Sequence, residues 1–217
     1  MKYQLAIFDM DGTILDTLED LKNAVNAALV QNDCPERTLE EVRRFVGNGI
    51  RKLVERAVPE GSDAAFVDRV LADFTAYYEV HSMDRTRPYE GIPELLRSIR
   101  EKGIRTAVVS NKIDPAVQDL CRRFFDGLFD IAVGERPGMA RKPAPDSCML
   151  VLETLQVEPT EAVYIGDSDV DLATARAAGL PEILVEWGFR DREELEPLGA
   201  SCFAKDTAQL EALLLQE

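Results

Sequence analysis

The sequence predicts an α/β fold in which a doubly wound parallel sheet carries an inserted helical domain. Short, almost continuously apolar runs alternate with helical patterns, which is typical of strands buried on both faces of a parallel sheet. Residues 17–83 interrupt this alternation, because they contain helical patterns and no strand candidate. Carboxylates, a hydroxyl group and a lysine also follow the predicted strands, where sheets of this kind place their functional sites.

Five runs along the chain are predicted to form the strands of the sheet. They are YQLAIF (3–8), RTAVVS (105–110), FDIAVG (129–134), AVYIGD (162–167) and EILVEW (182–187). Helices are expected between them: one that stops at Gly103, one over Ile113 to Arg123, one carrying Met149, Leu152 and Leu155, and one that is rich in alanine. The alanine-rich helix is predicted to end at Gly179, because a left-handed helix cap favours glycine.

The helical segment that interrupts the strands predicts a second, smaller domain. It contains the stretches LEDLKNAVNAALVQ, LEEVRRFVG, IRKLVERAV and DAAFVDRVLADFTAYYEVH. We therefore expect residues 1–16 and 84–217 to form the sheet domain and residues 17–83 to form the helical domain. The segments ILDT and MDRTRPYEG are the expected connections between the two.

The composition is that of an acidic globular protein. Among 217 residues, 25 are Lys or Arg and 40 are Asp or Glu, so the net charge is −15. This charge argues against nucleic acid or an anionic membrane surface as a partner. We expect no signal peptide and no membrane span, because no segment has the required apolar pattern and length. The cysteines lie far apart, as expected for reduced thiols in a cytoplasmic protein: Cys34, Cys121, Cys148 and Cys202.

The pattern D-x-D-G-T directly follows the first predicted strand and is the most specific motif in the chain. Asp9 and Asp11 stand one residue apart at the end of this strand. Such a pair repels itself unless a positive group lies between the carboxylates or one of them carries a proton. The motif therefore indicates a metal site or a catalytic site.

Further polar residues follow the later strands. The segment VVSNK places Ser110 and Asn111 after the second strand, and ARKPAP places Lys142 in a loop. The segment YIGDSDVD places Asp167 after the fourth strand and Asp171 at the start of the next helix. A nucleophile candidate, a hydroxyl donor, a cation and a third acid are therefore expected to converge on one edge of the sheet.

These motifs together resemble the haloacid dehalogenase-like superfamily of phosphohydrolases, in the subgroup that has a small helical cap. Residues 9–13 resemble its first motif, Ser110 its second, Lys142 its third and residues 166–171 its fourth. The match spans nearly the whole chain. The segments FVGNGIRKLVERA and RPYEGIPELL are most similar to phosphoglycolate phosphatase-type proteins. The resemblance implies a Rossmann-like catalytic core with the helical insert as its cap domain.

The resemblance also implies a mechanism that depends on Mg²⁺. Asp9 would attack phosphorus and form an aspartyl-phosphate, and Asp11 would act as acid and then as base. The implied metal ligands are the carboxylates of Asp9 and Asp167 and the backbone carbonyl of Asp11. Asp171 would orient water molecules bound to the metal.

The implied substrate contacts come from both domains. Ser110, nearby backbone N–H groups and Lys142 would hold the phosphoryl oxygens, where charge must be stabilised during transfer. The expected substrate-binding residues are Thr13, Ser110, Asn111, Lys142 and Arg51. The last of these belongs to a glycine-rich segment, residues 47–52, which either faces the substrate or only begins a helix.

The function that follows is hydrolysis of a small phosphate monoester by a cytoplasmic, magnesium-dependent phosphatase, as a monomer or homodimer. A phosphomutase of the β-phosphoglucomutase type shares these motifs, and a non-catalytic binding module on the same fold is a further alternative. Dehalogenation is disfavoured because dehalogenating relatives lack the second aspartate. Phosphonoacetaldehyde hydrolysis is disfavoured because those relatives lack an acid at the position of Asp11, although Lys52 could be sought as a Schiff-base lysine.

Overall fold

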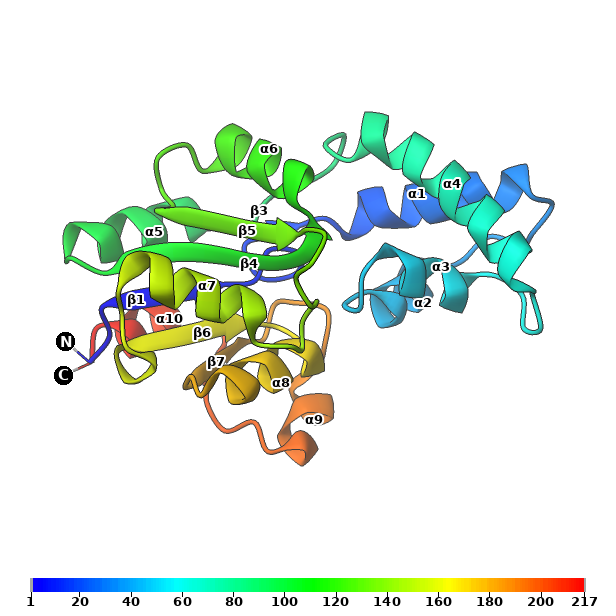
Figure 1. Ribbon diagram of the computed structural model, residues 1–217. Helices are drawn as coiled ribbons and strands as arrows, with labels where there is room; N and C mark the ends of the chain where they lie inside the picture. Colours follow the sequence, from blue (N-terminus) through cyan, green and yellow to red (C-terminus); the bar gives the residue numbers. More distant parts are fainter. Residues whose placement is uncertain (1, 217) are drawn as a thin grey trace. The chain divides into compact units, whose positions relative to one another are not determined.

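A parallel β-sheet forms the centre of the computed structural model, which describes residues 2–216 (Figure 1). In this part of the chain the sheet has six strands in the order β5-β4-β1-β6-β7-β8, and each adjacent pair is parallel. The strands are β1 (Leu5–Phe8), β4 (Arg105–Ile113), β5 (Ile131–Glu135), β6 (Ala162–Gly166), β7 (Glu182–Val185) and β8 (Phe203–Ala204). The predicted α/β fold class is confirmed.

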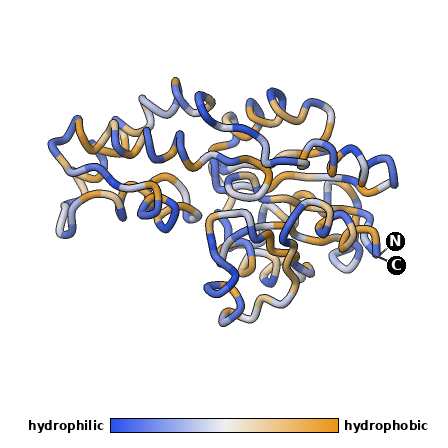
Figure 2. Tube along the Cα trace, turned by 180° about the vertical axis from the view of Figure 1, so that it is seen from behind, coloured by the Kyte–Doolittle hydropathy of each residue, from blue (hydrophilic) through white to orange (hydrophobic). Residues whose placement is uncertain are grey.

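Helices cover both faces of this sheet. On one face lie α7 (Asp146–Leu155) and α8 (Asp169–Ala178), and on the other lie α5 (Ile92–Glu101) and α10 (Thr207–Leu214) (Figure 1). A further helix, α6 (Asp114–Phe124), packs against β4 and β5. The central residues of the strands are apolar and buried, as expected where both faces of a sheet are covered; Figure 2 colours each residue by its hydropathy.

The end of β4 differs from the sequence prediction. The strand was expected to cover 105–110, but it continues to Ile113. Its pairing with β5 shifts register between Val109 and Ile113, where Ile113 pairs with Glu135. Ser110 and Asn111 therefore lie within the irregular end of the strand and not in a loop beyond it, because the strand pairing resumes after the shift.

The ends of α8 follow directly from its sequence. At its start, the Ser168 side chain accepts a hydrogen bond from the backbone of Asp171, and the Asp171 side chain accepts one from the backbone of Ser168. This reciprocal capping box fixes the first turn of the helix. At its end, Gly179 has φ 69°, so the predicted left-handed cap is confirmed.

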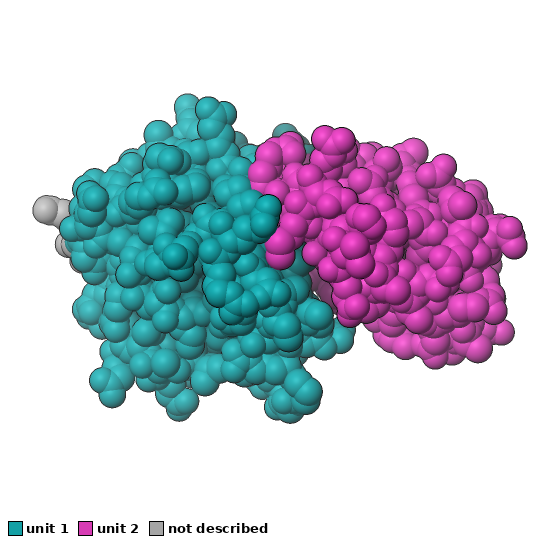
Figure 3. Space-filling view, turned by 90° about the horizontal axis from the view of Figure 1, so that it is seen from above, with its two compact units in different colours: residues 1–15, 88–217 teal, residues 16–87 magenta. Residues whose placement is uncertain are grey.

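The chain divides into two compact units, which Figure 3 shows in different colours. The core unit consists of Met1–Leu15 with Pro88–Glu217 and contains the sheet. The helical unit consists of Asp16–Arg87. The strands β2 (Leu15–Asp16) and β3 (Arg87–Pro88), which pair with each other, mark the two places where the chain passes between the units.

The helical unit is built from α1 (Leu18–Gln31), α2 (Leu39–Phe45), α3 (Ile50–Ala57) and α4 (Ala64–His81). The two longest helices, α1 and α4, pack against each other. The carboxylate of Asp20 is buried at the start of α1 and accepts hydrogen bonds from the backbone N–H groups of Arg85 and Thr86. This contact ties the first helix of the unit to the segment that leaves it.

Short elements complete the core unit. They are the helix α9 (Arg192–Leu195) and the 3₁₀ helices at Pro159–Glu161 and Glu196–Leu198. No helix between residues 2 and 216 has both the length and the apolar character that crossing a membrane requires.

Candidate active site

The polar residues at the carboxyl ends of β1, β4 and β6 meet at one edge of the sheet. Strand β1 lies between β4 and β6, and Phe8 at its end pairs with Val108 on one side and Ile165 on the other. The residues just beyond these three positions must therefore be neighbours. In this way the parallel register brings Asp9 and Asp167 together although they are far apart in sequence.

A buried lysine connects the first motif with the fourth. The Nζ atom of Lys142 lies 2.7 Å from Oδ1 of Asp9 and 2.8 Å from Oδ1 of Asp171. Its side chain is only 3% exposed. Burial by itself lowers the pKa of the Lys142 ammonium, but the charges of Asp171 and Asp9 outweigh burial and raise it. Lys142 is therefore held as a cation at the edge of the sheet.

Asn111 holds the backbone of the loop that carries this lysine. Its Oδ1 accepts a hydrogen bond of 2.9 Å from the backbone N–H of Lys142, and its Nδ2 donates one of 3.1 Å to the Lys142 carbonyl. Asn111 was predicted to bind substrate. The hydrogen bonds that the structure gives its amide fix the position of Lys142, and a role of Asn111 in binding substrate stays a prediction.

The carboxylate of Asp171 is surrounded by hydrogen-bond donors. Its Oδ1 accepts from Lys142 and, at 3.0 Å, from the hydroxyl of Tyr164. Its Oδ2 accepts from the hydroxyl of Ser168 at 2.6 Å and from the backbone N–H groups of Ser168 and Asp167. Burial alone raises the pKa of Asp171, but Lys142 and these donors outweigh burial and hold it below its usual range. Asp171 is therefore a buried carboxylate that supports Lys142.

Two different loops hold the carboxylate of Asp167. The hydroxyl of Thr13 donates to its Oδ1 at 2.9 Å, and the backbone N–H of Phe189 donates to its Oδ2 at 2.7 Å. Glycines allow both loops to approach, because an added Cβ would lie 2.4 Å from Asp167 Oδ2 at Gly12 and 2.2 Å from Asp167 Cβ at Gly188. Burial, followed by the charge of Asp171, raises the pKa of Asp167 to about 7.

The loop after β7 also contacts the first motif. The indole Nε1 of Trp187 donates a hydrogen bond of 3.0 Å to the backbone carbonyl of Thr13. The rings of Trp187 and Tyr89 lie 6.4 Å apart between centroids. The only tryptophan in the sequence thus contacts the first motif.

The acidic groups at this edge have the chemistry of a site for a hard cation. Asp9, Asp167 and Asp171 each offer a carboxylate oxygen, and these oxygens lie within 4.8 Å of one another. Burial, followed by the charge of Asp171, raises the pKa of Asp9 well above its usual range. Closely spaced, buried carboxylates such as Asp9 and Asp167, whose charged forms are disfavoured, suit Mg²⁺, which prefers oxygen ligands. The donor set therefore fits the expected metal.

Asp11, the second aspartate of the motif, pairs with Lys112 and not with Lys142. Both of its carboxylate oxygens contact Nζ of Lys112, at 3.0 and 3.2 Å. Lys112 stands two residues after Ser110, and its backbone N–H donates to the hydroxyl oxygen of Ser110 at 3.2 Å. The two aspartates of the motif thus avoid mutual repulsion, because each is paired with its own lysine.

Arg51 belongs to the helical unit and lies in the first turn of α3. Its guanidinium forms ion pairs with Asp68 and, at 3.7 Å, with Glu55 in the same unit. Gly49 is the N-cap of this helix, so the glycine-rich segment does begin a helix. The role of Arg51 in binding substrate stays a prediction.

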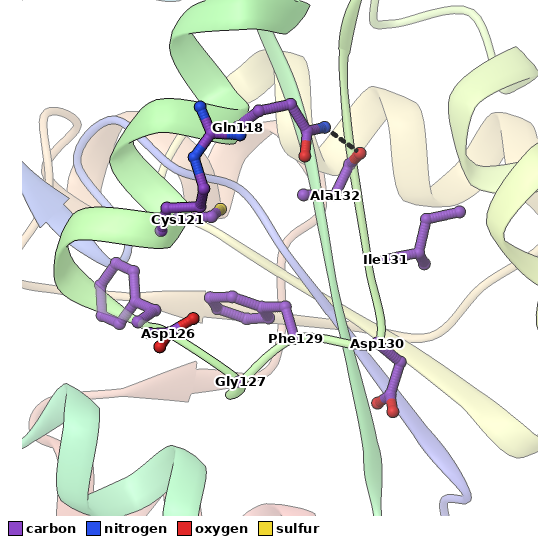
Figure 4. Close-up of a pocket in the computed structure, with 10 residues that line it drawn as sticks. Gln118, Cys121, Asp126, Gly127, Phe129, Asp130, Ile131 and Ala132 are labelled. Carbon is purple, nitrogen blue, oxygen red and sulfur yellow. Dashed lines mark hydrogen bonds between the residues drawn. The ribbon is translucent and has the colours of Figure 1, made fainter.

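A pocket of about 370 Å³ lies elsewhere in the core unit, between the end of α6 and the start of β5 (Figure 4). Cys121, Phe129 and Asp130 contribute to its walls, and Gln118 donates a hydrogen bond to the Ala132 carbonyl beside it. Because the start of a parallel strand lies at the opposite edge from its end, this pocket is separate from the acidic site.

The family of the chain follows from comparison with known proteins. A model of the haloacid dehalogenase-like hydrolase family matches residues 6–185, a range that includes every motif at the site. The chain belongs to this family. The predicted family resemblance is therefore confirmed.

Individual similar proteins of the haloacid dehalogenase-like hydrolase family carry more specific names than the family model does. The chain is 33% identical over 214 residues to a phosphoglycolate phosphatase of Pseudomonas putida, which covers 95% of this chain and 78% of that protein. It is 30% identical over 191 residues to one from Aquifex aeolicus, with 86% of each chain covered. A crystal structure from Lactobacillus delbrueckii, whose protein is provisionally named a phosphoglycolate phosphatase, matches with TM-score 0.96, 40% identity and full coverage of both chains.

Sequence reasoning missed three residues at the site of this family member. They are Lys112, which contacts Asp11, Tyr164, which contacts Lys142 and Asp171, and Phe189, whose backbone holds Asp167. The first two could have been suspected, because Lys112 stands beside Ser110 and Tyr164 lies in the strand that leads to Asp167. The backbone contact of Phe189 has no signal in the sequence.

Proposed function

We propose that this chain is a magnesium-dependent phosphatase that hydrolyses a small phosphate monoester similar to 2-phosphoglycolate. The observation that carries the proposal is the buried contact between Lys142 and Asp9 beside two further acids. A carboxylate next to a buried cation offers a nucleophile together with a partner for the negatively charged oxygens of a phosphoryl group. The names of the Pseudomonas and Aquifex relatives support the choice of substrate.

Mg²⁺ would be held by the carboxylates of Asp9 and Asp167 and by the backbone carbonyl of Asp11. When bound, it would reduce the repulsion between the Asp9 carboxylate and the anionic substrate and stabilise charge on the phosphoryl oxygens. Asp171 would support this site indirectly, because its oxygens already accept hydrogen bonds from Lys142, Tyr164 and Ser168.

The reaction would have two steps, with Asp9 as nucleophile. In the first, a carboxylate oxygen of Asp9 forms a bond to phosphorus while the bond from phosphorus to the ester oxygen breaks. Asp11, which carries a proton at the start of this step, gives it to that oxygen, which leaves as an alcohol. In the second, a water molecule gives a proton to Asp11 and attacks the same phosphorus, which releases inorganic phosphate and restores the Asp9 carboxylate.

Lys142 and Ser110 would bind the phosphoryl oxygens that do not react. Two contacts hold Lys142 in place. The amide of Asn111 binds the Lys142 backbone, and the carboxylate of Asp171 binds the Lys142 ammonium. Such fixed donors need little rearrangement during transfer, which is the main source of their catalytic effect. Thr13 would act through Asp167, to which its hydroxyl donates.

The core unit would be the catalytic domain and the helical unit a cap that selects the substrate. Arg51 is the candidate specificity residue of the cap, because its guanidinium is a strong partner for a carboxylate or phosphate. The ion pairs with Asp68 and Glu55 hold its side chain within the helical unit. Binding of an anionic substrate by Arg51 would therefore compete with these carboxylates.

The experiment that tests the proposal is a panel of phosphate esters assayed with Mg²⁺ and after removal of the metal by EDTA. It includes 2-phosphoglycolate, sugar phosphates, nucleoside monophosphates, pyrophosphate and p-nitrophenyl phosphate, with the Asp9→Asn variant as control. We expect release of inorganic phosphate that needs both Asp9 and Mg²⁺. Conversion of a hexose 1-phosphate to the 6-phosphate without release of phosphate would instead identify a phosphomutase, and inactivity on every ester would contradict an enzymatic role.

A further inference from the structure

Lys112 is a buried cation that the two-step reaction leaves without a role. Its side chain is 6% exposed, and its Nζ lies 3.0 and 3.2 Å from the two carboxylate oxygens of Asp11. A buried lysine needs a partner that compensates for the loss of water around its charge. Asp11 provides a carboxylate within ion-pair distance of it.

The fold fixes Lys112 at this place from its backbone. The irregular end of β4 carries it past the last regular pair with β5, at Val109, and the backbone N–H of Lys112 donates to the hydroxyl of Ser110. On the other side the backbone of β5 approaches closely, because a Cβ added at Gly134 would lie 2.7 Å from the Lys112 carbonyl oxygen. The end of β4, whose backbone is constrained, therefore places the Lys112 ammonium next to Asp11.

The geometry separates the two aspartates of the first motif. Asp9 lies in the acidic cluster with Asp167 and Asp171, whereas the carboxylate of Asp11 is drawn toward the end of β4. A contact of one ammonium with both oxygens restricts the rotation of the carboxylate and keeps it apart from the other acids.

We propose that Lys112 is a positioning residue for Asp11, whose carboxylate it orients for proton transfer with the leaving-group oxygen. The inference rests on the proposed phosphatase function and adds a residue to it. Lys112 itself would touch no reacting atom. Its contribution would be largest for esters whose alcohol cannot leave without a proton and smallest for esters with an activated leaving group.

The test compares two esters in the full-length protein with Mg²⁺: the best alkyl ester of the panel and p-nitrophenyl phosphate. Because a misplacement of about 1 Å can cost about 100-fold in rate, Lys112→Met should lower kcat on the alkyl ester by about 100-fold. The loss on p-nitrophenyl phosphate should be several times smaller. Lys112→Arg, which can still hold both carboxylate oxygens, should recover part of the loss.

Two further variants separate positioning from a general structural role. Adding Lys112→Met to Asp11→Asn should cause no further loss on the alkyl ester, because no carboxylate remains to be oriented. Lys102→Met is the matched control, since Lys102 pairs with Glu211 on the surface of the same unit. It should leave the ratio of the two rates unchanged. If Lys112→Met does not fold, the losses on the two esters are compared for Lys112→Arg and for the double variant instead.

Equal losses on the two esters, or a further loss in the Asp11→Asn background, would overturn the assignment of Lys112. The proposed function would stand in that case, because the unmodified protein would still hydrolyse both esters. Failure of the unmodified protein on every ester would contradict the proposed function itself, and the role of Lys112 with it.

Discussion

The ammonium of Lys142 lies 2.7 Å from a carboxylate oxygen of Asp9, although 133 positions separate the two residues in the sequence. The contact joins the loop before α7 to the end of β1, and a second contact of 2.8 Å adds Asp171 on α8. One side chain therefore links three segments of the core unit in a buried position. This linkage has consequences for stability as well as for chemistry.

Replacing Lys142 by methionine should destabilise the protein by about 3–5 kcal/mol, because it leaves buried carboxylates without their cation. It should also abolish most of the phosphatase activity. Urea unfolding measures the first effect. The control is Lys102→Met, which removes an ion pair whose lysine is 48% exposed and should change stability by less than about 1 kcal/mol. A loss of stability no larger than that of the control would show that the buried contact is not formed.

The raised pKa of Asp167 predicts how metal-free stability changes with pH. Its pKa is about 7 in the folded protein against 3.8 as the ordinary value, so the folded state binds more protons between these limits. Its contribution to stability is therefore greatest below about pH 4 and declines as the pH rises toward 7. Relative to Asp167→Asn, the unmodified protein should lose on the order of 1–3 kcal/mol between pH 5 and 8.

Saturating Mg²⁺ should reverse that loss, because the metal binds the deprotonated carboxylate and stabilises the folded state more at pH 8 than at pH 5. Thermal unfolding with and without the metal at both pH values measures the effect. A stability difference between the two proteins that does not change with pH would contradict the raised pKa.

Trp187 should report metal binding without any turnover. It is the only tryptophan, and its indole N–H donates to the carbonyl of Thr13, whose hydroxyl in turn holds Asp167. Binding of Mg²⁺ should therefore change the emission of Trp187 in a saturable way. In Asp167→Asn the change should disappear or need far more metal. If Mg²⁺ does not change the emission spectrum of the unmodified protein, the predicted link between the Trp187 loop and the metal site is wrong.

Replacing Arg51 by alanine should change the ranking of esters in the panel more than it changes the thermal midpoint. Its ion pairs with Asp68 and Glu55 involve partly exposed side chains, so their loss costs little stability. A substrate with a second anionic group should lose the most, because its extra charge would be the partner of the guanidinium. Arg44→Ala, on α2 of the same unit, is the control. An unchanged ranking would leave Arg51 with a role at the start of α3 alone.

Five strands of the sheet and the site edge could be predicted because both depend on local pattern, whereas the two-residue strand β8 was not predicted. Buried parallel strands are apolar throughout, and their carboxyl ends must share an edge, so Asp9 and Asp167 could be placed together from the sequence. The cap at Gly179 was predicted for an equally local reason. The irregular end of β4 was not, because the register shift depends on the pairing with β5.

The partners of the site residues could not be read from the sequence in the same way. The sequence places Asn111 near the site, but only the fold shows that its amide forms hydrogen bonds with the backbone of Lys142. The pairing of Asp11 with Lys112 likewise depends on how far β4 extends. Motifs thus predict which groups gather at the edge, while the contacts among them depend on the approach of distant segments.

The covalent role of Asp9 is the central claim, and mass spectrometry of the Asp11→Asn variant tests it most directly. This variant keeps the nucleophile but lacks the base of the second step, a contribution of about 10²–10⁴-fold. With p-nitrophenyl phosphate, whose leaving group needs no proton, a phosphoenzyme should accumulate. After an acid quench it should be about 80 Da heavier, with the added group on Asp9. A label on Ser110, or rapid-quench samples that turn over substrate without any phosphoenzyme, would contradict the mechanism.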